Sequence, residues 1–516
     1  MFQSEWRSLS QIENFIGFMN TPILKAKKGS KEIMFYNDGE YEAWKADNDA
    51  SKWKVKYYKG LGTSTSKEFK EYFKEQKFVL FNHNGEHCDD AIDKVFNKKR
   101  ADDRKDWLGK YERERYLDTN TDKISYQDFI DREMIHFSKY DCDRSIPNMM
   151  DGLKISLRKI LYAAFLKNLK DEIKVAQFSG YVSEKSAYHH GEASLNQAIV
   201  GMAQNYVGSN NINLFEPNGQ FGTRLQGGKD SASERYIFTK LNKITRFIFP
   251  EIDDKILKYL DDDGFPVEPV FYAPIVPMLL INGSKGIGTG FSTDIMPYHP
   301  KEIIMYIKQK LQGLNTLDSF IPYFEGFRGT VRKMEKSKYL IKGVYETVGK
   351  DTIRVTELPV GVWTDDYKQF LESLMEGAAR GERKTKKVAI VKEYTDMSTD
   401  KRVDITIKLL RGKLDELEDT ETVIGEDVLY NELEKTLKLI TTNTTTNMHV
   451  FNHEEKLKKY NKVTDIIDDF FEHRMHLYCE RKKAMIRYVT KELKLITNKA
   501  KFCLLYTSPS PRDDEL

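Results

Sequence analysis

One segment of the chain, residues 222–236, places a nucleophile beside positive charge in a loop of small residues. It ends in Arg235 and Tyr236, and Arg224 and Lys229 lie upstream. A tyrosine hydroxyl has an ordinary pKa of about 10, so it needs a neighbouring cation or base to attack. A guanidinium holds an anionic phosphate in bidentate geometry. These residue types suit attack on a phosphodiester, and the alternative is a surface turn with an ordinary half-buried tyrosine.

Two helical patterns precede this segment and would position it. Residues 149–165 and residues 191–207 each carry apolar side chains on one helical face, and Gly208 can end the second helix. The two faces contain Leu153, Leu157, Ile160, Leu161 and Ala164, and Leu195, Ile199, Met202 and Tyr206. Two helices joined by a short glycine-marked connection in basic surroundings are typical of a helix-turn-helix that approaches DNA.

The overall charge does not by itself indicate a nucleic-acid partner. The chain has 516 residues, and its 82 Lys and Arg against 79 Asp and Glu give a net charge of +3. This length allows roughly three or four domains. Positive charge is concentrated between residues 221 and 246, where six cations stand against two anions, and between residues 144 and 185, where eight stand against four. A solvated protein face is the alternative interpretation of both segments.

The cysteines and the apolar runs exclude several classes of protein. Cys88, Cys142, Cys479 and Cys503 are scattered and contain no C-x-x-C pair, so the sequence predicts neither a zinc site nor a disulfide framework. This cysteine usage fits a reducing compartment. No apolar run is long enough to span a membrane, and the first residues do not form a signal peptide. The sequence therefore predicts a soluble, intracellular protein.

The other patterns predict a mixture of strands and helices. Strands are expected near residues 15–19, 33–36 and 53–58, and a helix is expected to begin at Thr65. The polar segment 86–125 is predicted to be a linker with a surface helix. Two further strands, at residues 388–394 and 403–409, are predicted to form a hairpin.

The last part of the chain carries an amphipathic pattern. Residues 463–502 predict a long helix, one face of which needs a partner. The segment 503–516 is not expected to continue this helix. It is similar to translated sequencing-adapter DNA and is predicted to be a non-native tail.

An ordered series of motifs resembles the eukaryotic kind of type IIA DNA topoisomerase. The resemblance covers residues 1–502. It is carried by Tyr57-Tyr-Lys-Gly-Leu-Gly-Thr-Ser-Thr-Ser-Lys-Glu, Arg144-Ser-Ile-Pro-Asn-Met-Met-Asp-Gly-Leu-Lys, Lys174-Val-Ala-Gln, Tyr188-His-His-Gly-Glu, Asn205-Tyr-Val-Gly-Ser-Asn-Asn, Gly219-Gln-Phe-Gly-Thr-Arg through Arg235-Tyr-Ile-Phe-Thr, and Pro277-Met-Leu-Leu-Ile-Asn-Gly-Ser-Lys-Gly-Ile-Gly-Thr-Gly.

The resemblance implies an α/β multidomain fold. Its expected parts are the C-terminal part of a TOPRIM domain (1–85), a charged linker (86–125), a winged-helix DNA cleavage domain (126–273), an α/β tower domain (274–445), the start of a coiled-coil helix (446–502) and the non-native tail (503–516). The resemblance also implies double-stranded DNA as a partner, a homodimer, and a nuclear location or, for a large-DNA virus, a place in the infected host cell.

The resemblance assigns roles to residues. Tyr236 is expected to attack a DNA phosphodiester and form a transient 5′-phosphotyrosyl bond, while Arg235 stabilises the phosphate. His190 and Arg158 match positions around the scissile phosphate. Ile287 matches an apolar wedge that kinks DNA. The positions expected to contact DNA are Lys59, Lys154, His189, Arg224, Lys229 and Ile287.

The family requires Mg²⁺ and ATP, and the resemblance places the ligands of both outside these residues. The chain is therefore expected to be an internal fragment of a larger protein. Two departures lie at the site itself. Glu234 stands where proline usually precedes the Arg-Tyr pair, and Lys154-Ile-Ser-Leu-Arg158 replaces Lys-Pro-Ser-Gln-Arg. The second departure removes a rigid proline from a helix start.

The sequence is compatible with three functions. The leading one is passage of one DNA duplex through another by the parent protein. The second is a catalytically incomplete module that binds DNA and self-associates. The third is a plain winged-helix DNA-binding regulator, which would leave the tyrosine series and the long helix without a role.

Overall fold

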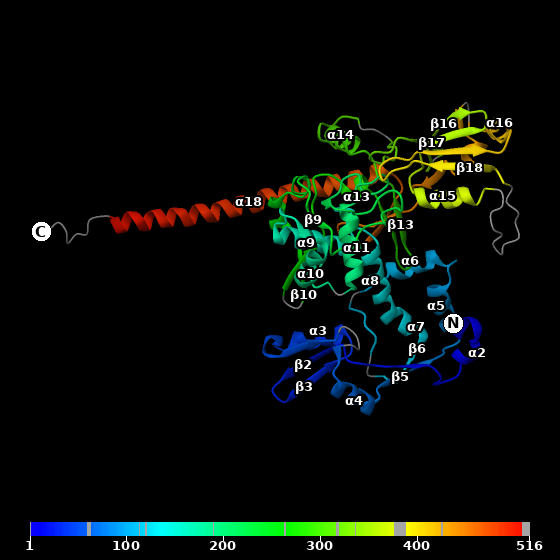
Figure 1. Cartoon of the computed structure of the whole chain (residues 1–516). Coiled ribbons are helices and arrows are strands. Elements are labelled where there is room, and N and C mark those ends of the chain that lie inside the picture. Colours follow the sequence, from blue (N-terminus) through cyan, green and yellow to red (C-terminus); the bar gives the residue numbers. More distant parts are fainter. Residues whose placement is uncertain are drawn as a thin grey trace. The chain divides into compact units, whose positions relative to one another are not determined.

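The computed structural model describes residues 2–58, 63–112, 114–118, 121–188, 190–262, 265–315, 319–335, 337–375, 389–424 and 427–507. The chain forms two compact units (Figure 1). Unit 1 comprises Met1–Ser145 and Ile287–Ser292, and unit 2 comprises Ile146–Gly286 and Thr293–Leu516. No helix within the described residues is long and apolar enough to cross a membrane. Cys88, Cys142, Cys479 and Cys503 are free in this structure.

Unit 1 contains two three-stranded sheets. Its strands are β1 (Gly17–Met19), β2 (Leu24–Lys28), β3 (Lys31–Phe35), β4 (Lys54–Tyr57), β5 (Phe78–Asn82) and β6 (Lys123–Ser125). In one sheet β2 lies between β3 and β4, with antiparallel pairing throughout. In the other, β5 pairs antiparallel with β1 and parallel with β6. The strands expected near residues 15–19, 33–36 and 53–58 are therefore confirmed.

Two helices of unit 1, α5 and α6, lie within the segment predicted to be a linker. The helices of the unit are α1 (Phe2–Glu5), α2 (Arg7–Ser10), α3 (Asp38–Asp47), α4 (Ser66–Glu75), α5 (Glu86–Phe96), α6 (Ala101–Gly109), α7 (Tyr126–Phe129) and α8 (Ile135–Ser145). Helices α5 and α6 bury Ala91, Val95, Trp107 and Leu108. Over these two helices segment 86–125 is therefore packed structure, and it buries Arg104 as well as the apolar residues.

Helix α4 begins as its sequence predicts. Thr65 accepts a hydrogen bond from the Glu68 backbone N–H, and the Glu68 carboxylate accepts one from the Thr65 backbone N–H, which completes a capping box. The same carboxylate accepts hydrogen bonds from the Tyr58 hydroxyl at 2.6 Å and from the Lys56 ammonium at 2.9 Å. Glu68 therefore joins the start of α4 to β4.

The first part of unit 2 combines helices with a small three-stranded sheet. Its elements are α9 (Ile155–Lys167), β7 (Ile173–Lys174), α10 (Val175–Lys185), α11 (Glu192–Ala203), β8 (Phe215–Asn218), β9 (Phe238–Leu241) and α12 (Thr245–Ile248). Strand β9 lies between β7 and β8, and both pairings are antiparallel. The buried side chains of these elements, among them Phe178, Leu195 and Phe215, belong to one large hydrophobic core. The two predicted helices exist as α9 and α11, although α9 begins only at Ile155. The short connection predicted between them is wrong, because β7 and α10 lie between the two helices.

Helix α11 is shorter than the predicted helix 191–207, and Gln204 supplies the reason. The chain turns to an extended conformation at Gln204. Its side-chain amide then donates hydrogen bonds to the carbonyl oxygens of Phe221 at 2.9 Å and Gly228 at 3.3 Å. The chain therefore leaves the helix at Gln204, and the side chain of this residue supports the loop between β8 and β9.

The middle of unit 2 continues with hairpins and a second core. The elements are β10 (Tyr259–Asp262), β11 (Phe265–Pro269), α13 (Met278–Asn282), β12 (Ser284–Ile287), β13 (Ser292–Ile295), α14 (Pro300–Leu311), β14 (Thr330–Glu335), β15 (Lys338–Lys342), β16 (Val344–Gly349), β17 (Thr352–Glu357), α15 (Thr364–Glu372), β18 (Val391–Asp396), β19 (Ile405–Leu409), α16 (Lys413–Glu418), β20 (Glu421–Ile424), β21 (Asp427–Asn431), α17 (Glu432–Thr436) and β22 (Ile440–Thr444). The second core lies between α15 and the four-stranded sheet β16-β17-β19-β18. Strands β18 and β19 pair antiparallel, so the predicted hairpin is confirmed.

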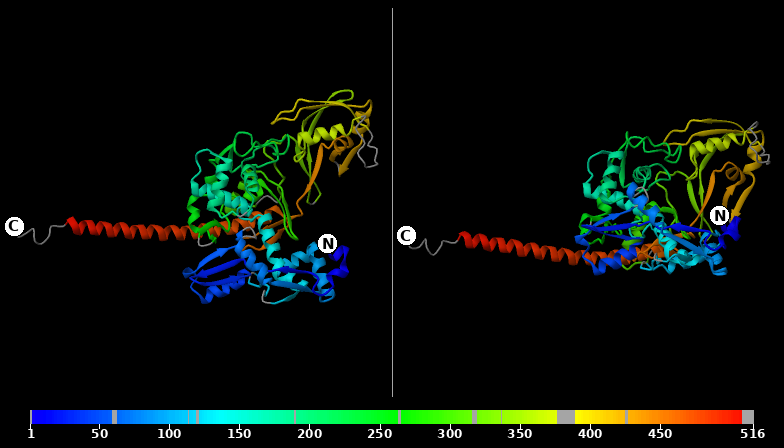
Figure 2. Two further views of the ribbon diagram at one scale, coloured as in Figure 1. Left: turned by 60° about the horizontal axis from the view of Figure 1, so that its bottom comes forward. Right: turned by 90° about the horizontal axis from the view of Figure 1, so that it is seen from below.

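The end of unit 2 is a hairpin followed by a long helix. The hairpin consists of β23 (Met448–Phe451) and β24 (Leu457–Tyr460), and the helix is α18 (Val463–Thr507). Arg474 of α18 bonds to buried Asp253 at 2.6 Å. Figures 1 and 2 show the later half of α18 running clear of the other elements of unit 2, and its residues there are exposed.

The prediction that the helix stops before Cys503 is wrong. Helix α18 includes Cys503, Leu504, Leu505, Tyr506 and Thr507. These residue types do not break a helix, whereas Pro509 is the first residue that would. The remaining residues of the predicted tail, 508–516, lie outside the described part of the chain.

We expect Glu68 to make the stability of unit 1 depend on pH. Burial opposes ionisation, but the Thr65 N–H, Tyr58 and Lys56 outweigh it and lower the pKa of Glu68 to about 2. A carboxyl group whose pKa is lowered on folding stabilises the fold above its unfolded pKa of about 4.3, and this contribution disappears as the pH falls towards 2. Glu68→Gln should therefore cost on the order of 2 kcal/mol at pH 7.

Hydrogen exchange of the α4 amides at pH 7 and at pH 3 measures this difference. The gap in protection between wild type and Glu68→Gln should shrink at the lower pH. Glu75→Gln, at the other end of α4, is the matched control and should show no comparable change. An equal gap at both pH values would contradict the assignment.

Candidate active site

The loop between β8 and β9 presents Tyr236 to solvent. Tyr236 is 73% exposed, whereas Ile237, the next residue, is almost fully buried. The Ile237 carbonyl accepts a hydrogen bond from the Val175 N–H at 3.0 Å, and the Tyr236 N–H donates to the Ser233 carbonyl at 2.9 Å. A buried residue therefore fixes the backbone immediately beside an exposed phenol. Arg235 is also exposed, with its guanidinium carbon 5.9 Å from the centre of the Tyr236 ring.

Glycines allow this loop to pass close to other parts of unit 2. Gly227 and Gly228 have φ of 62° and 82°, in the left-handed region. A Cβ on Gly227 would lie 2.3 Å from Trp363, and one on Gly228 would lie 2.4 Å from the Gln204 amide nitrogen. Both substitutions would therefore meet a strained backbone and an occupied space. The loop has its shape because these two residues have no side chain.

Arg224 ties the loop to the second core and does not face solvent. Its side chain is buried and forms an ion pair with Glu357 of β17, which is fully buried. The adjoining backbone is also held: the Asp365 N–H donates to the Leu225 carbonyl at 3.0 Å. The expectation that Arg224 contacts DNA is therefore not supported by its position, because its guanidinium is already engaged inside the protein.

Lys229 and Glu234 lie beside a groove of about 800 Å³. Lys229 is exposed, so its ammonium is available to an anion. Glu234 is half-buried, and its backbone carbonyl accepts a hydrogen bond from the Ala176 N–H at 3.1 Å. Its carboxylate accepts a weak hydrogen bond from Ser233 at 3.4 Å. The anion next to Arg235, unexpected in the sequence, thus lines the same groove as Glu192 of α11.

Arg158 points into the protein and forms a second buried ion pair. Its guanidinium donates to Asp151 at 2.7 and 3.1 Å and to the Leu153 carbonyl at 2.9 Å. Burial disfavours the charge of Arg158, but the Asp151 carboxylate outweighs this and raises its pKa. Asp151 also accepts a hydrogen bond from the Tyr272 N–H at 2.9 Å. A phosphate contact by Arg158 would require this network to open, so the structure does not bring its guanidinium to the surface with Tyr236.

The other predicted contact residues have varied positions. The Lys154 ammonium donates to the Lys285 carbonyl at 2.7 Å, and burial lowers its pKa. The His190 ring lies 5.4 Å from the Tyr188 ring, edge to face. Lys59 and His189 lie outside the described residues.

Ile287 belongs to unit 1, at the end of β12. Its side chain is 83% exposed. The neighbouring Thr289 is fixed by hydrogen bonds from its hydroxyl to Asp141 at 3.0 Å and from the Cys142 thiol to its carbonyl at 3.3 Å. An apolar side chain is therefore displayed on a turn that is itself held in place.

Sequence reasoning missed the residues that position the loop. Asp151 lies within the family motif at residues 144–154, but the motif does not indicate that its carboxylate pairs with Arg158. Glu357 and Trp363 carried no local signal. Their importance comes from contacts across more than a hundred residues, such as the 133-residue separation between Arg224 and Glu357.

Two family matches divide the chain. Residues 144–510 match the family of the A subunit of DNA gyrase/topoisomerase IV, and residues 19–142 match the C-terminal associated domain of TOPRIM. The chain belongs to the type IIA DNA topoisomerase family.

Within this family the chain is similar to eukaryotic DNA topoisomerase 2. It is 44% identical over 507 residues to DNA topoisomerase 2 of Plasmodium falciparum, and the match covers 98% of this chain and 35% of that protein. DNA topoisomerase 2-beta of Homo sapiens is 43% identical over 518 residues, covering 97% and 30%. A crystal structure of the Plasmodium falciparum topoisomerase II DNA-binding, cleavage and re-ligation domain matches with a TM-score of 0.82 and 44% identity, covering 98% of this chain and 66% of that one. The chain spans about a third of the length of the curated relatives it matches.

We expect Arg224→Ala to destabilise the loop strongly. Removal of one partner from a buried ion pair leaves an uncompensated charge and costs about 3–5 kcal/mol. Hydrogen exchange of residues 219–237 should show this loss. The matched control Arg235→Ala removes an exposed guanidinium and should stay within about 0.5 kcal/mol of wild type. The double variant Arg224→Met, Glu357→Leu should recover most of the loss, and equal protection in both single variants would refute the buried-pair assignment.

Proposed function

We propose that this chain is the DNA cleavage and religation part of a type II DNA topoisomerase, with Tyr236 as the nucleophile. The observation that carries the proposal is the exposed Tyr236 beside the exposed Arg235, on a loop fixed by buried contacts. The family match supports the same role, and the similar Plasmodium falciparum structure is that of a DNA-binding, cleavage and re-ligation domain.

The proposed reaction exchanges one phosphate ester for another. The Tyr236 oxygen attacks phosphorus and loses its proton to solvent or a base, while the 3′ oxygen of DNA leaves and gains a proton. A 5′-phosphotyrosyl ester and a free 3′ hydroxyl result. The reverse attack by that hydroxyl restores the DNA without a new energy donor. Arg235 would hold the phosphate oxygens during both steps, since a guanidinium pairs with phosphate in bidentate geometry.

At the tyrosine loop, no group of three or more His, Cys, Asp and Glu side chains among the described residues has ligand atoms that converge. Mg²⁺ prefers oxygen ligands in octahedral geometry. Among the described residues, the one group of His, Cys, Asp and Glu side chains that could hold an ion is His453, Asp469 and His473. None of these belongs to the tyrosine loop. We therefore propose that Mg²⁺ and ATP act on residues of the parent protein outside this chain, and no step above is routed through them.

The parts of the fold support finer assignments within this proposal. Helices α10 and α11 with the sheet β7-β9-β8 would form the winged-helix DNA cleavage domain (126–273), and the second core would belong to the tower domain (274–445). Residues 1–85 would end a TOPRIM domain. The eukaryotic relatives favour a nuclear location over a viral one.

Helix α18 would begin a coiled coil at residues 446–502 that joins two copies of the protein. Its exposed apolar residues Ile486, Val489, Leu493 and Ile496 are spaced by three, four and three positions. This is the spacing of a coiled-coil seam, which needs a partner helix. DNA and a second copy of the chain are therefore the proposed partners.

A catalytically incomplete module that binds DNA and self-associates is the second candidate. The observation that favours it is the absence of an acidic metal-binding group beside Tyr236 in the described part of the chain. Magnesium-dependent nicking of plasmid DNA by this chain alone separates the two candidates. Nicking that depends on Tyr236 would exclude the incomplete module.

Tyr236→Phe should abolish covalent attachment of DNA by the longer protein that contains this chain. Phenylalanine keeps the ring but has no oxygen to form the ester. Denaturant trapping followed by gel electrophoresis measures the covalent complex, and the loss should exceed about a hundredfold because the attacking oxygen itself is removed. Tyr488→Phe removes the hydroxyl of a different exposed tyrosine, one on α18, and should leave trapping unchanged. Trapping that survives Tyr236→Phe would refute the role.

Ile287→Ala should reduce DNA bending without unfolding unit 1. An apolar wedge inserted between base pairs costs a few kcal/mol of unstacking, which extra contacts offset. Because Ile287 is exposed in the free protein, its truncation should change stability by less than about 0.5 kcal/mol. Fluorescence energy transfer across a doubly labelled duplex measures the bend. Ile304→Ala, at an exposed apolar residue of α14, is the control. Wild-type bending by Ile287→Ala would exclude the wedge.

A further inference from the structure

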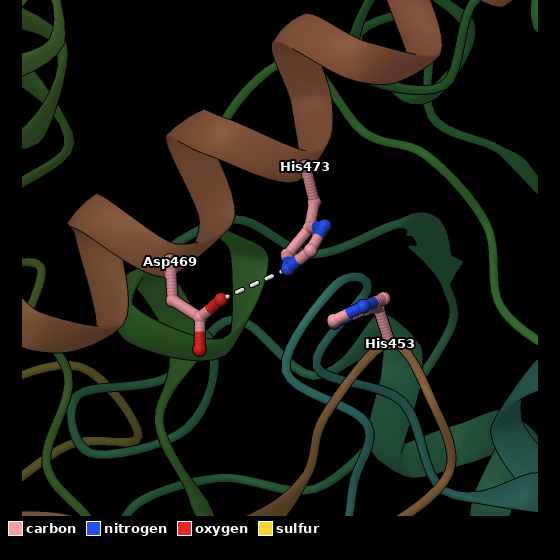
Figure 3. A group of neighbouring side chains, drawn as sticks. All are labelled: His453, Asp469 and His473. Carbon is pink, nitrogen blue, oxygen red and sulfur yellow. Dashed lines mark ion pairs between the residues drawn. The ribbon is translucent and has the colours of Figure 1, made fainter.

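A cluster of three ligand-type side chains lies where the last hairpin meets α18. His453 comes from the turn between β23 and β24, and Asp469 and His473 come from successive turns of α18 (Figure 3). One ligand atom of each lies within 4.8 Å of the other two. The Nε2 atom of His473 is 3.0 Å from Oδ1 of Asp469. Three side chains that have no part in the tyrosine loop are thus gathered at one point.

The arrangement of hydrogen bonds leaves ligand atoms directed to the centre of the cluster. Oδ2 of Asp469 accepts hydrogen bonds from the Lys458 ammonium at 2.6 Å and from the Tyr460 hydroxyl. These two contacts orient the carboxylate, as partners outside a metal's ligand shell commonly do. Oδ1 pairs with Nε2 of His473 at 3.0 Å, on the side of the carboxylate that belongs to the cluster. Lys458 and Tyr460 therefore prepare one oxygen for a ligand.

His453 contributes an unpaired nitrogen. Its Nδ1 atom is buried and has no hydrogen-bond partner, and the two imidazole rings lie with their centres 3.3 Å apart. Burial and the neighbouring His473 lower the pKa of His453. A buried imidazole nitrogen without a partner loses hydration without compensation. A cation bound between the two imidazole rings would be coordinated by a nitrogen atom of each.

We propose that His453, Asp469 and His473 bind a divalent transition-metal ion of the zinc type. Two imidazoles and one carboxylate are a ligand set that Zn²⁺ accepts, with water in the fourth position. Binding requires the stacked rings to turn so that their nitrogen lone pairs converge. The side chains are partly exposed, at 33%, 14% and 26% respectively, so an ion can reach them from solvent.

The bound ion would fasten the hairpin β23-β24 to the first turns of α18. Asp469 and His473 are four residues apart and therefore lie on the same face of the helix. His453 is brought to that face by the turn of the hairpin. A metal that binds the folded state and not the unfolded one stabilises it in proportion to the logarithm of its concentration. The bound ion would restrict movement of α18 relative to the hairpin β23-β24.

Titration of the purified chain with Co²⁺ tests the site, because Co²⁺ in a low-symmetry site of nitrogen and oxygen ligands absorbs visible light. One equivalent should produce a saturable band that Zn²⁺ displaces. His453→Ala and His473→Ala should each weaken binding by about tenfold or more, and Zn²⁺ should raise the unfolding temperature of wild type but not of these variants.

His476→Ala is the matched control, because it removes an exposed histidine on the same helix, three residues beyond His473. It should bind Co²⁺ as wild type does. No saturable band with wild type, or equal binding by His453→Ala, would overturn the proposal. Loss of the band in His476→Ala with retention in His453→Ala would place the ion elsewhere and would also overturn it.

Discussion

The carboxylate of Glu357 is fully buried at the end of β17, and two guanidinium groups, those of Arg224 and Arg328, neutralise it. A charge taken out of water costs several kcal/mol unless partners surround it. The position of Arg224 is therefore determined by the second core of unit 2, and Arg224 in turn positions the tyrosine loop. Gly227 against Trp363 and Leu225 against Asp365 extend the same contact. The placement of Tyr236 thus depends on residues that the chain reaches only after another hundred positions.

Arg158 and Asp151 repeat this arrangement at the start of α9. Asp151 accepts hydrogen bonds from the backbone of Leu153 and Tyr272 as well as from Arg158. The helix start lacks the rigid proline expected there, and its N-terminal residue Lys154 makes no side-chain cap. The buried bidentate ion pair of Arg158 with Asp151 joins α9 to the turn that precedes it. The two buried arginines, Arg158 and Arg224, thus hold parts of the protein together. The exposed Lys229 and Arg235 remain available to an anion.

The parts of the fold that depend on neighbouring residues could be predicted from sequence. The capping box at Thr65, the hairpin β18-β19 and the long helix α18 each follow from patterns within about ten residues. The loss of the last turn predicted for α11 could not be predicted, because Gln204 leaves the helix to bond with carbonyls of a loop that begins fifteen residues later. The burial of Arg224 was missed for the same reason, because its partner Glu357 lies 133 residues further along the chain. The burial of Arg158 was missed although its partner Asp151 lies only seven residues before it. A basic residue looks alike in sequence whether its partner is a phosphate or a buried carboxylate.

The exposure of side chains separates these two kinds of residue. Burial of an isoleucine typically contributes about 1.5–3 kcal/mol, yet Ile287 is left in solvent on a turn that Asp141 and Cys142 hold in place. Tyr236 is exposed beside Ile237, which is buried. In both cases the backbone is held in place, but the exposed side chain contributes little hydrophobic burial to the stability of the fold. A side chain that could pack but is instead held outward on a rigid support has its contact surface available for something outside the chain, and this exposure is what supports the proposed contact of each residue with DNA.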